Sequence, residues 1–165
     1  MLNFKCRMMA NMCYNTVSFY GTPEKIQAVE KLFTELAAKE QQDNCGQRPS
    51  FVSAGEAWFF HIRWEEDLLY FESRWEPILD ILRQVADHFQ LEFECEFEEL
   101  DNLIFGIGIY RYGTLTEIRL DNADLNQYPF DKGSDRYYFE GEFWECQEEI
   151  LEILLDRKRN LFYGI

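Results

Sequence analysis

The stretch LYFESRWEPILDILRQVADHFQLEFECEFEEL, residues 69–100, predicts a strand, a helix and a second strand in succession. Residues 69–72 have the composition of a strand end. Ser73, followed by Glu76 and Pro77, matches a helix entry with a capping residue, its glutamate partner and an early proline. Helical spacing then relates the apolar residues Ile78, Ile81, Leu82, Val85 and Phe89. From residue 91 the period changes to two, which is the period of a strand with one buried face.

This second strand carries glutamates on the face opposite its apolar side chains. The apolar face consists of Leu91, Phe93, Cys95 and Phe97, and the glutamate ladder consists of Glu92, Glu94, Glu96 and Glu98. Successive carboxylates of the ladder lie about 6.6 Å apart, at roughly 3.3 Å of rise per residue. Four unpaired charges at this spacing repel one another, which is typical of a solvated sheet face that discourages edge-to-edge pairing. The same charges also offer a surface to a basic partner.

The residues before this stretch complete a known order of elements. Residues 14–20 are β-branched and aromatic and predict a strand, and a helix follows with Pro23 in its first turn and its end near Lys39. Two further strands are predicted at residues 57–64 and 68–72. The order β-α-β-β-α-β predicts an α+β, ferredoxin-like fold, in which an antiparallel sheet carries two helices on one face.

The residues after the stretch predict a C-terminal extension of this fold. Residues 103–110 and 115–120 flank a glycine-bearing turn and predict a hairpin, residues 137–144 predict a last strand, and residues 145–159 a terminal helix. The hairpin contains the pair Gly106 and Gly108. This pair does not predict a phosphate loop, because it lies inside a strand, opens no helix and lacks a third glycine. Close packing against the strand is the more common reason for such glycines.

The expected domain organisation is simple. Residues 1–8 have no periodicity and precede a second methionine, so we treat them as an N-terminal extension. Residues 9–165 are expected to form one domain, with its core in residues 14–100 and the C-terminal extension in residues 101–165.

Charge is the extreme feature of the composition. The 165 residues are 47% hydrophobic and 17% aromatic, which favours a globular protein over a disordered one. The formal net charge is −15, and residues 91–165 contain 18 acidic and 7 basic side chains. A surface of this sign repels nucleic acid and anionic membranes, because binding to either depends on lysine and arginine. We therefore expect a basic protein partner, no direct nucleic-acid binding and no membrane binding.

Cysteine and histidine usage excludes several classes of chemistry. The five cysteines are scattered without CxxC spacing, which indicates reduced thiols rather than disulfides or a zinc site. With only two histidines, the chain lacks the parts for most acid–base and metal schemes, so we predict no catalytic residue, no cofactor and no metal ligand. No apolar run approaches the ~20 residues that span a bilayer, and no signal-peptide pattern is present. The expected location is cytoplasmic.

Four motifs of the sequence resemble a known family. They are MANMCYNTVSFYG at residues 9–21, LYFESRWEP at 69–77, the strand that ends in Glu98 and Glu99, and FGIGIYRYG at 105–113. Together they resemble the ferredoxin-like domain of the phage- and plasmid-borne Api-like proteins, over roughly residues 9–158. The resemblance implies the same fold and a mobile-element or prophage context. It carries over no catalytic residue.

Two classes of function remain open at this point. The first is a non-enzymatic acidic interaction module, whose ladder of Glu92, Glu94, Glu96 and Glu98 binds a basic protein, in a sharper version as a mimic of nucleic acid. The second is a small-molecule-binding domain or enzyme, with a pocket between the sheet and residues 103–144. Its candidate residues are His61, Arg63, Arg111 and Arg119. Self-association through exposed aromatic residues is a further alternative.

Overall fold

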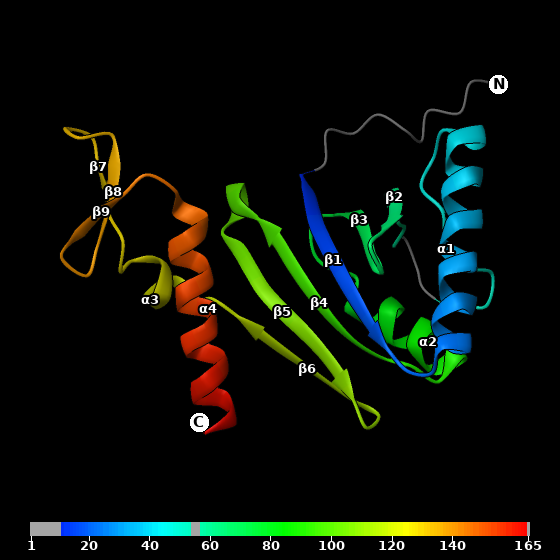
Figure 1. Ribbon diagram of the computed structural model, residues 1–165. Coiled ribbons are helices and arrows are strands. Elements are labelled where there is room, and N and C mark those ends of the chain that lie inside the picture. Colours follow the sequence, from blue (N-terminus) through cyan, green and yellow to red (C-terminus); the bar gives the residue numbers. More distant parts are fainter. Residues whose placement is uncertain (1–10, 54–56, 165) are drawn as a thin grey trace.

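The computed structural model describes residues 11–53 and 57–164, so the predicted extension over residues 1–8 lies outside the described residues. The elements of the first hundred residues follow the predicted order (Figure 1). They are β1 (Met12–Tyr20), α1 (Pro23–Asp43), β2 (Phe60–Glu65), β3 (Leu68–Arg74), α2 (Leu79–Phe89) and β4 (Glu92–Glu99). The β-α-β-β-α-β order of a ferredoxin-like α+β fold is thus confirmed.

These strands form one antiparallel sheet that the hairpin extends. The strand order is β2-β3-β1-β4-β5-β6, in which β5 (Ile104–Arg111) and β6 (Thr114–Arg119) form the predicted hairpin beyond β4. Tyr112 and Gly113 connect β5 to β6 with φ angles of 51° and 74°. Two consecutive left-handed residues are typical of the hairpin turn whose twist matches that of the strands.

Helices α1 and α2 lie on one face of the sheet and enclose the main core with it (Figure 1). Phe33 of α1, Leu82 of α2 and Phe93 of β4 are fully buried in this core. Gly108 of β5 lies directly against α2, because a Cβ atom there would meet the Cδ2 atom of Leu79 at 2.5 Å. The glycines of the hairpin therefore serve close packing, as the sequence indicates, and they open no helix.

The last third of the chain covers part of the opposite face. Its elements are the 3₁₀ turn η2 (Leu100–Asn102), α3 (Asn122–Leu125), β7 (Phe130–Asp131), β8 (Arg136–Phe139), β9 (Glu142–Trp144) and α4 (Gln147–Tyr163). Helix α4 lies beside β5 and β6, and its Leu155 packs on the cluster of Ile107, Ile109 and Ile118 (Figure 1). These isoleucines alternate along the strands with residues that face α2, so α4 and α2 lie on opposite faces.

A second apolar cluster joins α4 to the small sheet of β7, β8 and β9. Ile150, Leu151 and Leu154 of α4 are buried there against Phe139 of β8 and Tyr128. The separate cluster explains how the extension beyond residue 100 holds its own shape. The single-domain organisation of residues 9–165 stays a prediction.

The helix entry after β3 differs from the sequence-based prediction. Helix α2 begins at Leu79 with Ile78 as its N-cap, so the capping role predicted for Ser73, Glu76 and Pro77 is wrong. Ser73 stays in β3 because it pairs with Cys13 across the sheet. Its buried hydroxyl accepts a hydrogen bond from the Asn15 side chain and donates one to the carbonyl of Glu76. Pairing in the sheet therefore outweighs the local capping signal.

Two strand predictions also require correction. Residues 137–144 form a hairpin rather than one strand, because Glu140 and Gly141 turn the chain between β8 and β9 with φ angles of 51° and 91°. Strand β2 begins at Phe60 rather than residue 57. It contains an irregularity at His61, where the carboxylate of Glu40 accepts the backbone N–H groups of His61 and Ile62 at 2.7 and 3.0 Å.

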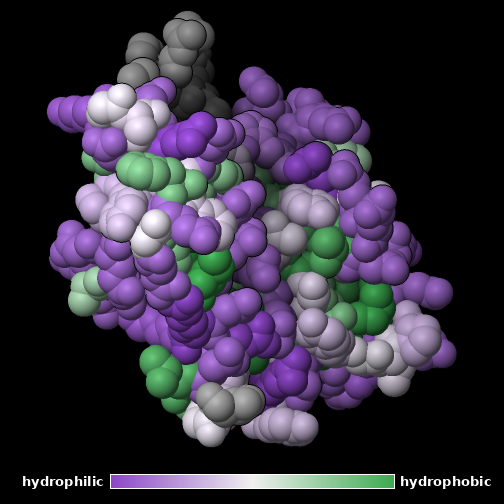
Figure 2. Space-filling model, turned by 60° about the vertical axis from the view of Figure 1, so that its left-hand side comes forward, coloured by the Kyte–Doolittle hydropathy of each residue, from purple (hydrophilic) through white to green (hydrophobic). Residues whose placement is uncertain are grey.

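The side of the molecule drawn in Figure 2 is predominantly polar. Figure 2 shows hydrophilic residues over most of the visible side, with hydrophobic residues as separate spots between them. Within the described ranges, no helix is long and apolar enough to cross a membrane.

Candidate functional site

The glutamate ladder lies on the face of β4 that α1 and α2 do not cover. Glu96 stands opposite Thr16 on β1 and Ile107 on β5, and Glu98 stands opposite Tyr14 on β1. Residues paired across neighbouring strands share a face of the sheet. Because Ile107 packs against α4, the ladder faces the side on which α4 lies.

The first half of the ladder has partners within the chain. Glu92 accepts a hydrogen bond from the backbone N–H of Tyr112 at 3.0 Å. Glu94 binds two guanidinium groups, that of Arg111 on β5 at 2.7 Å and that of Arg159 on α4 at 3.1 Å. The expectation of four unpaired charges is therefore wrong for Glu92 and Glu94, because the hairpin and α4 bring donors to them.

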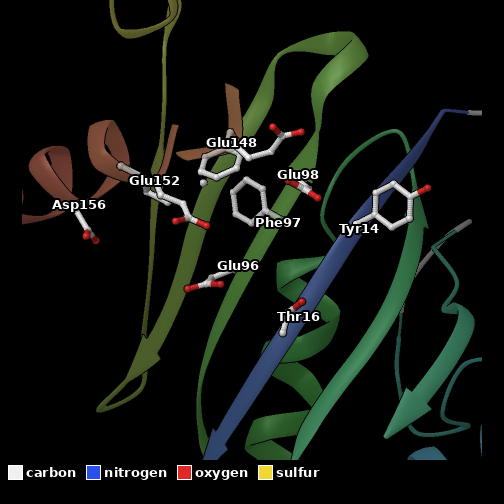
Figure 3. A pocket seen from close by; sticks show the side chains of 11 residues that line it. Tyr14, Thr16, Glu96, Phe97, Glu98, Glu148, Glu152 and Asp156 are labelled. Carbon is white, nitrogen blue, oxygen red and sulfur yellow. The ribbon is translucent and has the colours of Figure 1, made fainter. Parts of the chain in front are cut away.

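The second half of the ladder forms one wall of an acidic groove. Glu96 and Glu98 of β4 face three carboxylates of α4, and Figure 3 shows Glu148 and Glu152 extending from the helix toward the strand. The groove has a volume of about 510 Å³. We define the acidic groove by its five carboxylates, which are Glu96, Glu98, Glu148, Glu152 and Asp156. The lining is completed by Tyr14, Thr16, Phe97, Phe105, Gly106 and Leu155.

The carboxylates on the two walls of the groove repel one another. Burial raises the pKa of Glu98 above its ordinary value, and the charges of Glu148 and Glu152 raise it further. Among the residues that the structure describes, no lysine or arginine lines the groove. The negative charge is therefore uncompensated within the described lining, which favours a cation or a basic side chain as occupant.

The groove offers negative charge and hydrogen-bond acceptors. In the described part of the chain, no set of three or more His, Cys, Asp or Glu side chains is arranged to hold a metal ion. Neither histidine lines the groove. His61 binds Glu72 through Nδ1 at 2.9 Å, and His88 stacks on Phe51 with ring centroids 3.8 Å apart.

The four residues of the alternative pocket do not come together. His61 and Arg63 belong to β2, at one edge of the sheet, where they line a second hollow beside the end of α1. Arg111 and Arg119 belong to β5 and β6, at the opposite edge. Arg111 binds Glu94, and Arg119 binds Glu117 at 2.7 Å. In the sheet, β3, β1 and β4 lie between the His61–Arg63 pair and the Arg111–Arg119 pair. The positions of these residues in the sequence do not show this separation.

Sequence reasoning missed the second wall of the groove. Glu148, Glu152 and Asp156 follow each other at intervals of four residues, which places them in one row along a helix. This spacing was a usable signal for an acidic row on α4. Only the packing of α4 against β5 and β6 brings that row opposite Glu96 and Glu98.

Comparison with known proteins agrees with the fold and adds no function. No curated protein and no solved structure matches the chain. Residues 56–140 match the family described as the ferredoxin-like domain in Api92-like protein, and this match covers half of the chain. The resemblance to this family is thereby confirmed over residues 56–140, which contain three of the four motifs. The chain belongs to the family of the ferredoxin-like domain in Api92-like protein.

Proposed function

We propose that the protein is a non-enzymatic interaction module that binds a basic segment of a partner protein in its acidic groove. The observation that carries this proposal is the set of five carboxylates that face one another across the groove without a basic residue in the described lining. Burial is the largest cause of the raised pKa of Glu98, and a basic segment would relieve the repulsion from Glu148 and Glu152 that adds to it. Electrostatic complementarity of this kind speeds association and selects partners.

The shape of the groove supports a polypeptide segment as occupant rather than a free ion. The side chains of Phe105 and Leu155 line the groove together with the carboxylates. A lysine or arginine side chain has an apolar stem and a charged head, so it can contact apolar lining and carboxylates at once. A simple cation would gain nothing from the apolar part of the lining.

The sharper version, a mimic of nucleic acid, has one feature in its support. The groove presents two rows of carboxylates, one on β4 and one on α4. Along β4 the charges lie about 6.6 Å apart, and along α4 about 6 Å apart, at rises of roughly 3.3 and 1.5 Å per residue. Two rows of evenly spaced negative charge are also what a duplex presents to a basic protein. Competition between duplex DNA and the groove for one basic peptide would test this version.

The test of the proposal uses a defined peptide that alternates lysine and arginine. Its dissociation constant is measured by calorimetry at low salt and again at high salt. The groove variant replaces Glu96, Glu98, Glu148 and Glu152 with Gln. Its matched control replaces exposed glutamates outside the groove, namely Glu66, Glu76, Glu142 and Glu149. Both variants lose the same charge.

We expect the groove variant to bind about tenfold more weakly or worse, since four exposed pairs at roughly 0.2–1 kcal/mol each are lost. The control variant should change the affinity less than about threefold, and high salt should weaken the binding of the parent protein. Equal losses in the two variants would mean that net charge, not the groove, attracts the peptide. That result, or no binding by the parent protein, would overturn the proposal.

A further inference from the structure

We propose that the acidic groove selects arginine over lysine in its partner, at a place formed by Tyr14 of β1 and Glu98 of β4. This inference rests on the proposed function and specifies the side chain that the groove recognises. A second place on the same sheet face, formed by Tyr20 and Glu94, binds an arginine of the protein itself.

At that second place, a tyrosine of β1 and a glutamate of β4 hold one guanidinium group together. Arg111 lies over the ring of Tyr20, with its Cζ atom 5.5 Å from the ring centroid. The same guanidinium group binds Glu94 at 2.7 Å. Tyr20 pairs in register with Glu92, the neighbour of Glu94 in the ladder. An aromatic ring on β1 and a carboxylate on β4 thus contact the guanidinium group of Arg111 together on this face.

The other end of the face has the same two groups without the arginine. Tyr14 of β1 pairs in register with Glu98 of β4, and both line the acidic groove. The side chain of Tyr14 is 56% exposed, so its ring is accessible. Among the described residues, no basic side chain forms an ion pair with Glu98 or lies over the ring of Tyr14. The β5 residue opposite Glu98 is Phe105 and not an arginine, so both groups are left for an arginine of a partner that enters the groove.

The chain uses this combination elsewhere as well. Arg157 donates to both carboxylate oxygens of Glu140, at 2.6 and 2.9 Å, and lies over Phe139 with 5.6 Å from its Cζ atom to the ring centroid. In the part of the chain that the structure describes, every cation stacked on an aromatic ring is an arginine. The planar guanidinium group binds a carboxylate through two donors and stacks on a ring, whereas the ammonium group of lysine is a compact, strongly hydrated charge.

The experiment compares two peptides of equal length and charge, one with six arginines and one with six lysines, each separated by glycines. Their dissociation constants are measured by fluorescence anisotropy with the parent protein and with three variants. Tyr14→Leu removes the ring and Tyr14→Phe keeps it. Tyr138→Leu removes a comparably exposed ring on the small sheet, outside the groove, and serves as the control.

We expect the arginine peptide to bind the parent protein about two- to fivefold more tightly, which is the range of one exposed cation–π contact. Tyr14→Leu should abolish this preference and leave the affinity for the lysine peptide unchanged, whereas Tyr14→Phe and Tyr138→Leu should preserve the preference. Equal binding of the two peptides would overturn the inference and leave the proposed function standing. A preference that persists in Tyr14→Leu would overturn the assignment to Tyr14, and no binding of either peptide would overturn both proposals.

Discussion

Replacing Gly106 with alanine should destabilise the fold substantially, because the strand has no room for a methyl group there. A Cβ atom at Gly106 would lie 2.6 Å from the carbonyl oxygen of Ile118 on β6 and 2.7 Å from Cζ of Phe97 on β4. Ordinary contacts begin at 3.4 Å, so the oxygen would have to move by about 0.8 Å. That oxygen belongs to the backbone of a paired strand, and it cannot rotate away as a flexible side chain could.

Overpacking in a core costs about 1–3 kcal/mol, and a clash with backbone belongs at the upper end of that range. We therefore expect Gly106→Ala to lower the free energy of unfolding by about 3 kcal/mol. In a chain of this length, that loss corresponds to a fall in melting temperature of roughly 6–12 °C. Urea denaturation followed by circular dichroism measures the free energy directly.

Two other glycines provide controls for this experiment. Gly133 has its nearest neighbour at 3.5 Å, so Gly133→Ala should change the stability by less than about 0.5 kcal/mol. Gly113 has open space around it but a φ angle of 74°, so Gly113→Ala should cost about 1 kcal/mol through backbone strain alone. If Gly106→Ala is as stable as Gly133→Ala, the close-packing explanation for the glycine pair is refuted.

Three further changes have clear expected results. Glu40→Ala removes the acceptor of two backbone N–H groups of β2 and should lower the free energy of unfolding by about 1–3 kcal/mol in urea; an unchanged value would contradict this role. Burial and two glutamates of α4 raise the pKa of Glu98, so its charge costs stability at pH 7. The Glu98→Gln variant should therefore have a higher melting temperature than the parent protein at pH 7. The difference should disappear as the pH falls to about 4, where the Glu98 carboxyl group of the parent protein is protonated and uncharged as well. Equal melting temperatures at pH 7 would contradict this prediction. Lys158→Ala removes the ion pairs that join α4 to Asp121 and Asp124 at the start of α3, and it should lower the free energy of unfolding by about 1 kcal/mol. The control Lys132→Ala, at an exposed position, should leave the free energy of unfolding unchanged.

Periodicity in the sequence predicted the core of the fold well. The alternation of residues 91–97 and the apolar spacing from residue 78 to residue 89 each admit one kind of element, and both elements formed as expected. Local signals failed where tertiary contacts opposed them. Ser73 has a good capping sequence after it, but its pairing with Cys13 and its bond to Asn15 keep it in the strand.

One missed feature was visible in the sequence. Glu140 and Gly141 form a turn of the kind that Asp-Gly and Asn-Gly also form, and the strand predicted at residues 137–144 ignored this signal. A two-residue turn between aromatic pairs predicts a short hairpin, which is what β8 and β9 form.

The sequence predicted one wall of the acidic groove, on β4, and missed the other wall, on α4. Alternation on β4 placed Glu96 and Glu98 on one face, but it could not show that Arg111 and Arg159 neutralise Glu94. The opposing row on α4 depends on how the helix packs against β5 and β6, and no local pattern contains that information. For the same reason the sequence could not show that His61 and Arg63 lie at the opposite sheet edge from the hairpin arginines.

The most direct test of the account is to map where a basic peptide binds. Titrating the arginine peptide into the isotope-labelled protein, and following the backbone amide signals by NMR, locates the contact residue by residue. We predict the largest shifts at the amides of Glu96 to Glu98, around Tyr14, and between Glu148 and Asp156. Shifts concentrated on β2 and β3, or spread evenly over all acidic surfaces, would contradict the claim that the acidic groove is the binding site.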